Sequence, residues 1–233
     1  GFEAAGSTAL DTTLTAATGN QKVVYKTKPT LASVLQPNTG NNSLTAGSPI
    51  AALRFKVSAD STGSISWKKA VFQVAMSNAT MSAASTANVI VRNVSTGNAL
   101  TLSTVYSGST STAATTATVT GGNTGYVGVE LTTEEEISAS GSRDYDLQLT
   151  FADITTTDNA GSAIVKLYRE ETSVVNATWY AGVAGAATDT NMTPSFIWSD
   201  RSVTSHATST ADWANGVFLK PGLFTDVVNS LQN

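Results

Sequence analysis

Apolar and polar residues alternate with a period of two in three stretches of the chain, at residues 53–58, 127–131 and 145–151. In the last stretch, Tyr145, Leu147, Leu149 and Phe151 are separated by Asp146, Gln148 and Thr150. Successive side chains of a β-strand point to opposite faces of its sheet, so this pattern predicts strands with one apolar and one solvated face. Each stretch therefore identifies a face that packs into a core.

A change of phase interrupts the alternation in the neighbouring apolar segment. Trp67 belongs to one apolar series, whereas Ala70 and Phe72 belong to a series displaced by one position. An extra residue in one strand of a pair produces such a shift, because it turns the following side chains to the other face. The pattern predicts a β-bulge around Lys68 and Lys69.

Further short apolar runs are separated by clusters of Gly, Asn, Ser and Thr, which are typical of turns. They predict strands at residues 23–26, 89–91, 100–106, 164–168, 195–198 and 217–219. About nine or ten short strands with turns between them are typical of a β-sandwich. We therefore expect an all-β protein with one antiparallel sandwich domain at residues 21–222, in which residues 107–124 form a long solvated hairpin or loop.

The two ends of the chain differ from this central part. Leu10 and Leu14 lie in strand period within residues 1–20, so this extension is predicted to be a strand that adds to its own sheet or to a neighbour's. In the short C-terminal tail, residues 223–233, the apolar residues fall at helical spacing behind a Pro-Gly pair. That spacing leaves a short amphipathic helix and a strand as alternatives.

The amino-acid composition favours strands over helices and excludes several classes of function. The chain carries 27 Ser and 37 Thr but only 13% charged residues, which suits pleated strands better than helices. It has no cysteine, which excludes disulfides, thiolate chemistry and zinc sites built on cysteine. The net charge of -4 and the scattered Lys and Arg provide no basic stripe for nucleic acid. No apolar run approaches the ~18 residues that a membrane span needs.

Two features fit a secreted protein. The chain begins at Gly1, which we expect to be a processed end, left by signal-peptide removal or by an engineered junction. Acceptor sequons for N-glycosylation occur at Asn41, Asn78, Asn93, Asn176 and Asn191. A chain rich in Ser, Thr and Asn also generates such triplets by chance, so glycosylation at these five sites is a hypothesis.

The only histidine, His206, lies close in sequence to Ser199, Asp200 and Asp212. A serine hydrolase needs a histidine base that an acid orients and that faces an activated serine. The sequence lacks the Gly-x-Ser-x-Gly turn that presents such a serine in one large class of hydrolases. In a chain this rich in serine, a serine near the histidine also arises by chance. We therefore predict that His206 makes a hydrogen bond in a turn or an interface, and that the chain is not an enzyme and holds no cofactor.

Acidic residues gather at Glu134, Glu135 and Glu136, with a second group at Asp153 and Asp158. Carboxylate oxygens are ligands that calcium prefers. Neither group has the spacing of a recognised calcium loop, so a solvated acidic turn is favoured over a metal site.

Aromatic residues raise the possibility of sugar binding. Trp67, Trp179, Trp198 and Trp213, with Tyr180, could form a flat platform on which sugar rings stack. Tryptophans that lie in strand pattern usually pack in a core, so core packing is the favoured interpretation.

The segment at residues 194–200 (PSFIWSD), followed by Ser205-His206 and residues 210–216 (TADWANG), resembles a C-terminal signature of large secreted surface proteins from candidate-phyla (patescibacterial) bacteria. Residues 51–61 (AALRFKVSADS) also resemble a strand motif of those proteins. The resemblance covers about a fifth of the chain and implies an immunoglobulin-like sandwich exposed at the cell surface. It carries over no catalytic residue, and because those proteins are often much longer, it suggests a compact subunit.

These observations lead to one expected function and two alternatives. We expect an extracellular, cell-surface structural subunit that polymerises with copies of itself into a pilus-like filament or a lattice. Strand addition by the N-terminal extension would join the copies, with Phe2, Leu10 and Leu14 as the inserted residues. A carbohydrate-binding or adhesin module that recognises surface glycans is the first alternative. A glycan-acting hydrolase with two facing carboxylates is the second.

Overall fold

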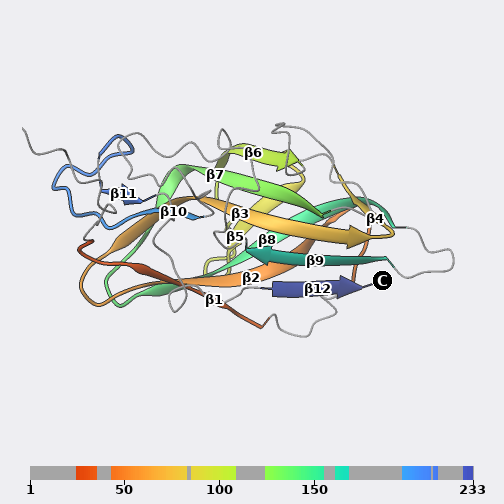
Figure 1. Ribbon diagram of the computed structural model, residues 1–233, viewed down its shortest axis with the longest axis horizontal. Coiled ribbons are helices and arrows are strands. Elements are labelled where there is room, and N and C mark those ends of the chain that lie inside the picture. The colour runs from red at the N-terminus through yellow and green to blue at the C-terminus, as the bar shows by residue number, and fades with distance from the viewer. Residues whose placement is uncertain are drawn as a thin grey trace, which may run out of the picture.

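A computed structural model of the chain describes residues 25–35, 43–82, 85–108, 124–154, 161–167, 196–210, 212–214 and 228–232. Every regular element in these ranges is a β-strand (Figure 1). The strands are β1 (Pro29–Ser33), β2 (Pro49–Ala59), β3 (Ile65–Ser77), β4 (Ala79–Met81), β5 (Val89–Asn93), β6 (Leu102–Gly108), β7 (Thr124–Ile137), β8 (Ser142–Ile154), β9 (Ser162–Leu167), β10 (Phe196–Ser199), β11 (Trp213–Ala214) and β12 (Val228–Gln232). No helix in the described part of the chain is long and apolar enough to cross a membrane.

The strands form two antiparallel sheets. In the first sheet β1, β2 and β8 are successive neighbours, and β4 and β5 pair with successive parts of β8. In the second sheet β6, β7 and β3 are neighbours, and β3 pairs along its first half with β10 and along its second half with β9. β11 follows β10 and β12 follows β9, so these two short strands lie at opposite ends of the sheet (Figure 1).

The core lies between the two sheets, in the manner of a β-sandwich. The apolar residues of the three alternating stretches are all buried, as their period predicts. Aromatic rings meet across the interface: the ring centroids of Phe55 and Phe72 are 5.6 Å apart, and those of Trp67 and Tyr145 are 5.2 Å apart. The sequence pattern therefore predicted both the all-β class and the residues that face the core.

The predicted β-bulge is present at Lys68. In the pairing of β3 with β7 the register shifts between Trp67 and Lys69, and β10 skips the same residue on the other side of β3. The ammonium group of Lys68 is buried and donates to the carbonyl oxygens of Leu131 and Thr132, at 2.9 and 3.3 Å. The bulged residue thus satisfies backbone acceptors of β7 that the interrupted ladder does not reach.

A short segment before β2 connects the two sheets along one side of the sandwich. The amide of Leu44 donates to the carbonyl of Gln232 in β12 at 2.8 Å, and the amide of Gly47 donates to the carbonyl of Phe151 in β8 at 2.8 Å. The side chains of Leu44 and Leu231 are both buried in the core. β12 is therefore bounded by β9 on one side and by residues 43–44 on the other.

Two of these expectations need correction, and a third is not tested. Tyr25 and Lys26 lie outside any strand, and the first described strand begins at Pro29 instead; proline is tolerated there because β1 is an edge strand and Pro29 is its first residue. The helical alternative for the C-terminal tail is wrong for β12, whose ladder with β9 fixes it as a strand. The predicted strand at residues 217–219 lies outside the described residues.

Candidate functional site

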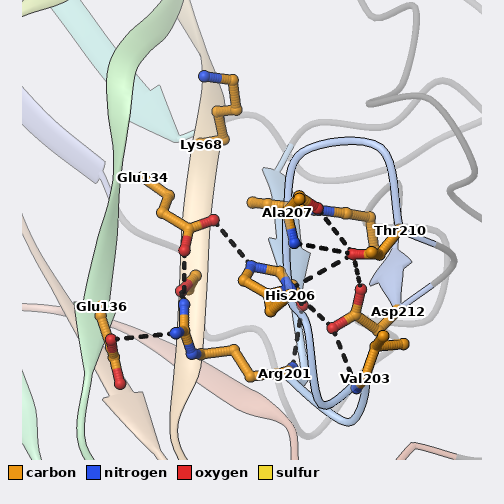
Figure 2. A network of polar contacts seen from close by, with 12 residues as sticks. Lys68, Glu134, Glu136, Arg201, Val203, His206, Ala207, Thr210 and Asp212 are labelled. Carbon is orange, nitrogen blue, oxygen red and sulfur yellow. Dashed lines mark hydrogen bonds and ion pairs between the residues drawn. The ribbon is translucent and has the colours of Figure 1, made fainter.

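The chain between β10 and β11, residues 200–212, is here called the histidine loop, and its side chains reach past β3 to the strand β7 (Figure 2). It contains much of the sequence signature that resembles secreted surface proteins. Its side chains converge with Glu134 and Glu136 of β7 in one polar network. The network joins five titratable side chains, those of Glu134, Glu136, Arg201, His206 and Asp212.

His206 lies at the centre of the network between two carboxylates (Figure 2). Its Nδ1 is 2.7 Å from Oδ2 of Asp212, and its Nε2 is 2.9 Å from Oε2 of Glu134. Only 6% of the His206 side chain is exposed, and its ring lies 5.3 Å from the ring of Trp213. Each ring nitrogen of His206 is thus within hydrogen-bonding distance of a carboxylate oxygen, one from the loop and one from the sheet. The histidine therefore bridges the loop and β7.

Arg201 makes a second bridge from the loop to the sheet. Its guanidinium pairs with Glu134 and with Glu136, the latter at 3.4 Å, and donates to Oγ of Ser66 in β3 at 2.8 Å. The backbone of Arg201 has φ of 49°, a left-handed conformation that is unusual for a residue with a side chain. A hydrogen bond from its amide to Oγ of Ser199, 2.9 Å long, supports this turn.

Asp212 closes the loop from its other end. Its carboxylate accepts hydrogen bonds from the hydroxyl of Thr210 and from His206, and its side chain has no exposed surface. Burial alone would raise the pKa of Asp212, but the hydrogen bonds from Thr210 and His206 and the charge of His206 outweigh it and lower that pKa below its ordinary value. The carboxylate is therefore held in its charged form.

Asp200 ties the loop to the beginning of the described chain. Its Oδ2 accepts the amide of Lys26 at 2.7 Å, and its Oδ1 accepts the amide of Ser202 at 3.1 Å. Beside this contact the ring of Tyr25 packs 4.9 Å from the ring of Trp198. Residues of the signature from Trp198 to Trp213 therefore have structural partners in the folded chain.

The arrangement lacks the geometry of a hydrolytic triad. Oγ of Ser199 is 3.5 Å from Nδ1 of His206, the same nitrogen that contacts Asp212, and the opposite nitrogen contacts Glu134. A triad needs the acid on one ring nitrogen and the serine on the other, so that the free nitrogen can take the serine proton. Both nitrogens of His206 are occupied by carboxylates, and the hydrogen-bonding role predicted for this residue is confirmed.

The prediction of a solvated acidic turn at Glu134, Glu135 and Glu136 is wrong. These residues lie within β7, where Glu135 accepts from the guanidinium of Arg143 at 2.9 Å and from the hydroxyl of Tyr145 at 2.8 Å. Strand geometry sends alternate residues to opposite faces, which separates Glu135 from the other two. Burial raises the pKa of the Tyr145 phenol, so it remains a donor to Glu135.

Within the described ranges, no group of His, Asp and Glu side chains converges in a way that could hold a metal ion. In the histidine network the two carboxylates lie on opposite sides of the imidazole ring, so they share no point at which a cation could sit. Asp153 lies in β8, and Asp158 lies outside the described residues.

Three of the candidate sugar-stacking tryptophans are core residues. Trp67, Trp198 and Trp213 are all fully buried, so no face of these rings is open to a sugar. Trp67 and Trp198 belong to the main core, whereas Trp213 packs with Ile197 on the outer side of β10. The strand predicted at residues 217–219, which Trp198 and Trp213 would pack, lies outside the described residues. Trp179 and Tyr180 lie outside the described residues.

The remaining predicted site residues divide into two groups. Phe2, Leu10, Leu14, Asn41, Asn176 and Asn191 lie outside the described residues. Asn78 occupies the turn between β3 and β4, where its φ of 50° suits an asparagine and its side chain is half-buried. Asn93 is only 6% exposed, and its Oδ1 accepts the amides of Ser95 and Thr96 at 3.0 and 3.3 Å. Of these two sequons, the folded chain presents Asn78 more openly.

Glycosylation at Asn78 is testable by mass. If native material is glycosylated, its intact mass should exceed the 24.0 kDa of the bare chain, and Asn78→Gln should remove part of the excess. Asn93→Gln should leave the mass excess unchanged, because the Asn93 amide is already engaged in the turn. The bare mass in native material would reject glycosylation at all five sequons.

A scan against protein-family models finds no match to this chain, and a search of curated proteins finds no match either. The interpretation of the histidine network accordingly rests on its geometry.

The lowered pKa of Asp212 predicts a specific acid sensitivity. Because its pKa lies below the ordinary 3.8, the charged carboxylate stabilises the fold fully above that value, and this stabilisation is lost as the pH falls through the lowered pKa. Asp212→Asn should therefore lower the free energy of unfolding by about 1–3 kcal/mol at neutral pH and flatten its fall in acid. Urea melts at a series of pH values measure both effects.

The matched control for this experiment is Asp144→Asn. Asp144 pairs with Lys56 at 3.7 Å on a half-exposed face, and such surface pairs contribute at most about 1 kcal/mol. Equal losses in the two variants, with parallel acid profiles, would contradict a special role for Asp212.

Proposed function

We propose that this chain is an extracellular structural subunit that polymerises into a cell-surface filament or lattice, and that copies join by adding an N-terminal strand to a neighbouring sandwich. The sandwich in this proposal is immunoglobulin-like, as the resemblance to secreted surface proteins implies. Its partners are copies of the same chain.

One observation carries the proposal. β12, a five-residue strand near the C-terminal end, completes the edge of the second sheet beside β9 and buries Leu231 in the core. A sheet edge that takes a short strand in this way has the features that strand addition uses: a backbone ladder for affinity and buried positions for alternate side chains. Residues 1–20 carry Leu10 and Leu14 in the strand period that such an edge accepts.

The network around His206 is a second, independent observation that supports a structural role. The signature segment uses its charged and hydroxyl groups to anchor the histidine loop to β3, to β7 and to Lys26. The adhesin alternative loses three of its sugar-stacking candidates, because Trp67, Trp198 and Trp213 are buried. The hydrolase alternative would have to use carboxylates other than Glu134, Glu135 and Glu136, each of which already has a cation or hydroxyl partner.

The test is electron microscopy of the purified full-length chain together with light scattering. Filaments or an ordered lattice are expected. A uniform population of 24.0 kDa monomers at every concentration and salt condition tried would reject the proposal.

A further inference from the structure

We infer that the open edge of β1, in the first sheet, is the acceptor site for the N-terminal extension of a second copy of this chain. Residues 10–14 of the donor copy lie beside residues 31–35 of the acceptor copy as an added strand. The inference rests on the proposed polymerisation and deepens it by naming the surface that receives the donor strand.

The backbone of β1 has free hydrogen-bonding groups along one side. β1 is the outermost strand on its side of the first sheet, and the ladder with β2 continues one residue beyond it, where the amide of Val34 donates to the carbonyl of Arg54 at 3.4 Å. Alternate residues of an antiparallel strand bond to the same neighbour, so the even-numbered positions of β1 face β2. The backbone groups of Leu31 and Ser33 therefore point away from β2, and no described residue pairs with them.

Two other strand edges of the sandwich are covered by neighbouring segments. On the opposite side of the first sheet, the amide of Leu100 donates to the carbonyl of Val91 in β5 at 2.7 Å, and in the second sheet β12 is bounded by residues 43–44. Edges without such cover are commonly protected by proline or by charge. Pro29 protects the first position of β1 in this way, but the positions that follow it on the open side do not have this protection.

The side chains along β1 also leave an apolar surface open. Leu31 is fully buried, whereas Ser33 and Leu35, which follow it at strand period, are exposed. Leu35 is 94% exposed, the highest value for a large apolar side chain in the described ranges. A single exposed leucine is common on a protein surface, but this one continues the core-facing series of a strand whose edge is open. A strand added beside β1 would cover it.

The extension carries the same side-chain pattern as this edge. Residues 10–14 (LDTTL) and residues 31–35 (LASVL) each have leucine at the first and fifth positions and a hydroxyl residue at the third. These three positions share one face of a strand. Because the pattern is symmetric about its centre, leucine meets leucine and Thr12 meets Ser33 in an antiparallel or a parallel pairing alike. Apolar and hydroxyl pairs of this kind stabilise neighbouring strands.

The connection between the extension and β1 favours donation to another copy. In an antiparallel pairing within one copy, this register places the turn at residues 21–24 (QKVV), which contain none of the residues that favour tight turns. Tyr25, the next residue, packs against Trp198 of the second sheet, and the amide of Lys26 donates to Asp200. A parallel pairing within one copy would need a long crossover connection. An extension that pairs with a second copy needs neither arrangement.

Disulfide cross-linking between separately labelled chains tests the inference. The chain has no cysteine, so Thr12→Cys and Ser33→Cys each introduce a single thiol. The two residues are directly opposite in either orientation of the added strand, and opposite residues of paired strands have Cα atoms about 4.5–5.5 Å apart, within the range that a disulfide spans. Full-length chains of the two variants, mixed, assembled and then oxidised, should give a two-chain band on a non-reducing gel.

The controls separate this pairing from random contact between thiols. Each single-cysteine variant alone should give no two-chain band. Ala32→Cys is the matched control for Ser33→Cys, because the adjacent side chain lies on the opposite face of β1 and should not reach Thr12→Cys. A chain that carries both Thr12→Cys and Ser33→Cys should form a ladder of covalent oligomers that reductant dissolves.

Three results would overturn the inference and leave polymerisation itself intact. Filaments without any cross-link would place the acceptor elsewhere on the sandwich. If the doubly substituted chain closes its disulfide internally and runs as a monomer, the extension pairs with its own β1. A two-chain band from Ser33→Cys alone would show that β1 pairs with β1 of another copy. Absence of filaments from the unsubstituted chain would instead reject the proposed function, and this inference with it.

A second variant tests the same edge without a thiol. Leu35→Asp should leave the stability of the fold unchanged, because the side chain is almost fully exposed, and should reduce filament formation to background, because the added strand would bury the charge. Ile164→Asp is the matched control: Ile164 is also an exposed apolar residue, but it lies on β9 in the second sheet and should assemble normally when substituted. Urea melts and electron microscopy of both variants measure the two effects. Normal filaments from Leu35→Asp would contradict an acceptor site at β1.

Discussion

Removing residues 1–20 is expected to leave a folded sandwich that no longer assembles. The described core begins at Tyr25, and β12 pairs with β9 of its own copy, so the truncated chain keeps the contacts of both sheets. It should melt cooperatively at close to the temperature of the full-length chain and appear as monomers by light scattering and electron microscopy. The loss of filaments should be complete, because the strand that joins the copies is absent.

A substitution in the full-length chain tests whether assembly needs the apolar residues of the extension or only its presence. Leu10→Asp with Leu14→Asp should also prevent assembly, since unpaired charges are too costly to bury in an apolar groove. Replacing Thr13 by Asp, on the opposite face of the same strand, is the matched control and should leave assembly intact. Ordered filaments from the truncated chain would contradict strand donation and place the contacts on the sandwich faces or at residues 223–233.

The features that the sequence predicted are those set by local side-chain period. Leu53, Val127 and Tyr145 face the core because alternate positions of a strand share a face, and the bulge at Lys68 is visible as a slip in that period. β1 carries too few apolar residues to display a period, so it could not be recognised. In the C-terminal tail the apolar spacing fits a helix, and only the ladder with β9, formed by a distant segment, selects the strand β12.

The histidine network could be predicted only in part. The contact between His206 and Glu134 joins residues 72 positions apart, and that between Arg201 and Ser66 joins residues 135 apart, so no local pattern reveals either pair. One signal was available. Glu134 lies three residues after the alternating stretch at residues 127–131, with two β-favouring threonines between, which indicates a continuing strand rather than a turn. A run of acidic residues on a strand predicts that cationic side chains of a neighbouring segment pair with it.

Trp213→Ala is expected to lower the free energy of unfolding by about 3–5 kcal/mol, the usual cost of emptying a large buried aromatic site. The ring is fully buried, packs with Ile197 on the outer side of β10, and lies against His206. Its Nε1 also donates to the carbonyl of Ala207 at 2.9 Å. The substitution therefore removes both the apolar support beneath the histidine loop and a hydrogen bond that fixes its course.

Trp213→Phe separates these two contributions. It keeps most of the apolar contact and loses the Nε1 donor, so the part of its cost due to the hydrogen bond should be about 0.5–1.5 kcal/mol. Urea melts of both variants give the free energies, and proteolysis in native buffer shows whether the histidine loop opens before the sandwich unfolds. A loss below about 1 kcal/mol for Trp213→Ala would contradict the burial of this ring, because a cavity of that size in a packed site lowers the free energy of unfolding by more than this. It would also remove the reason for regarding this ring as the apolar support beneath the histidine loop.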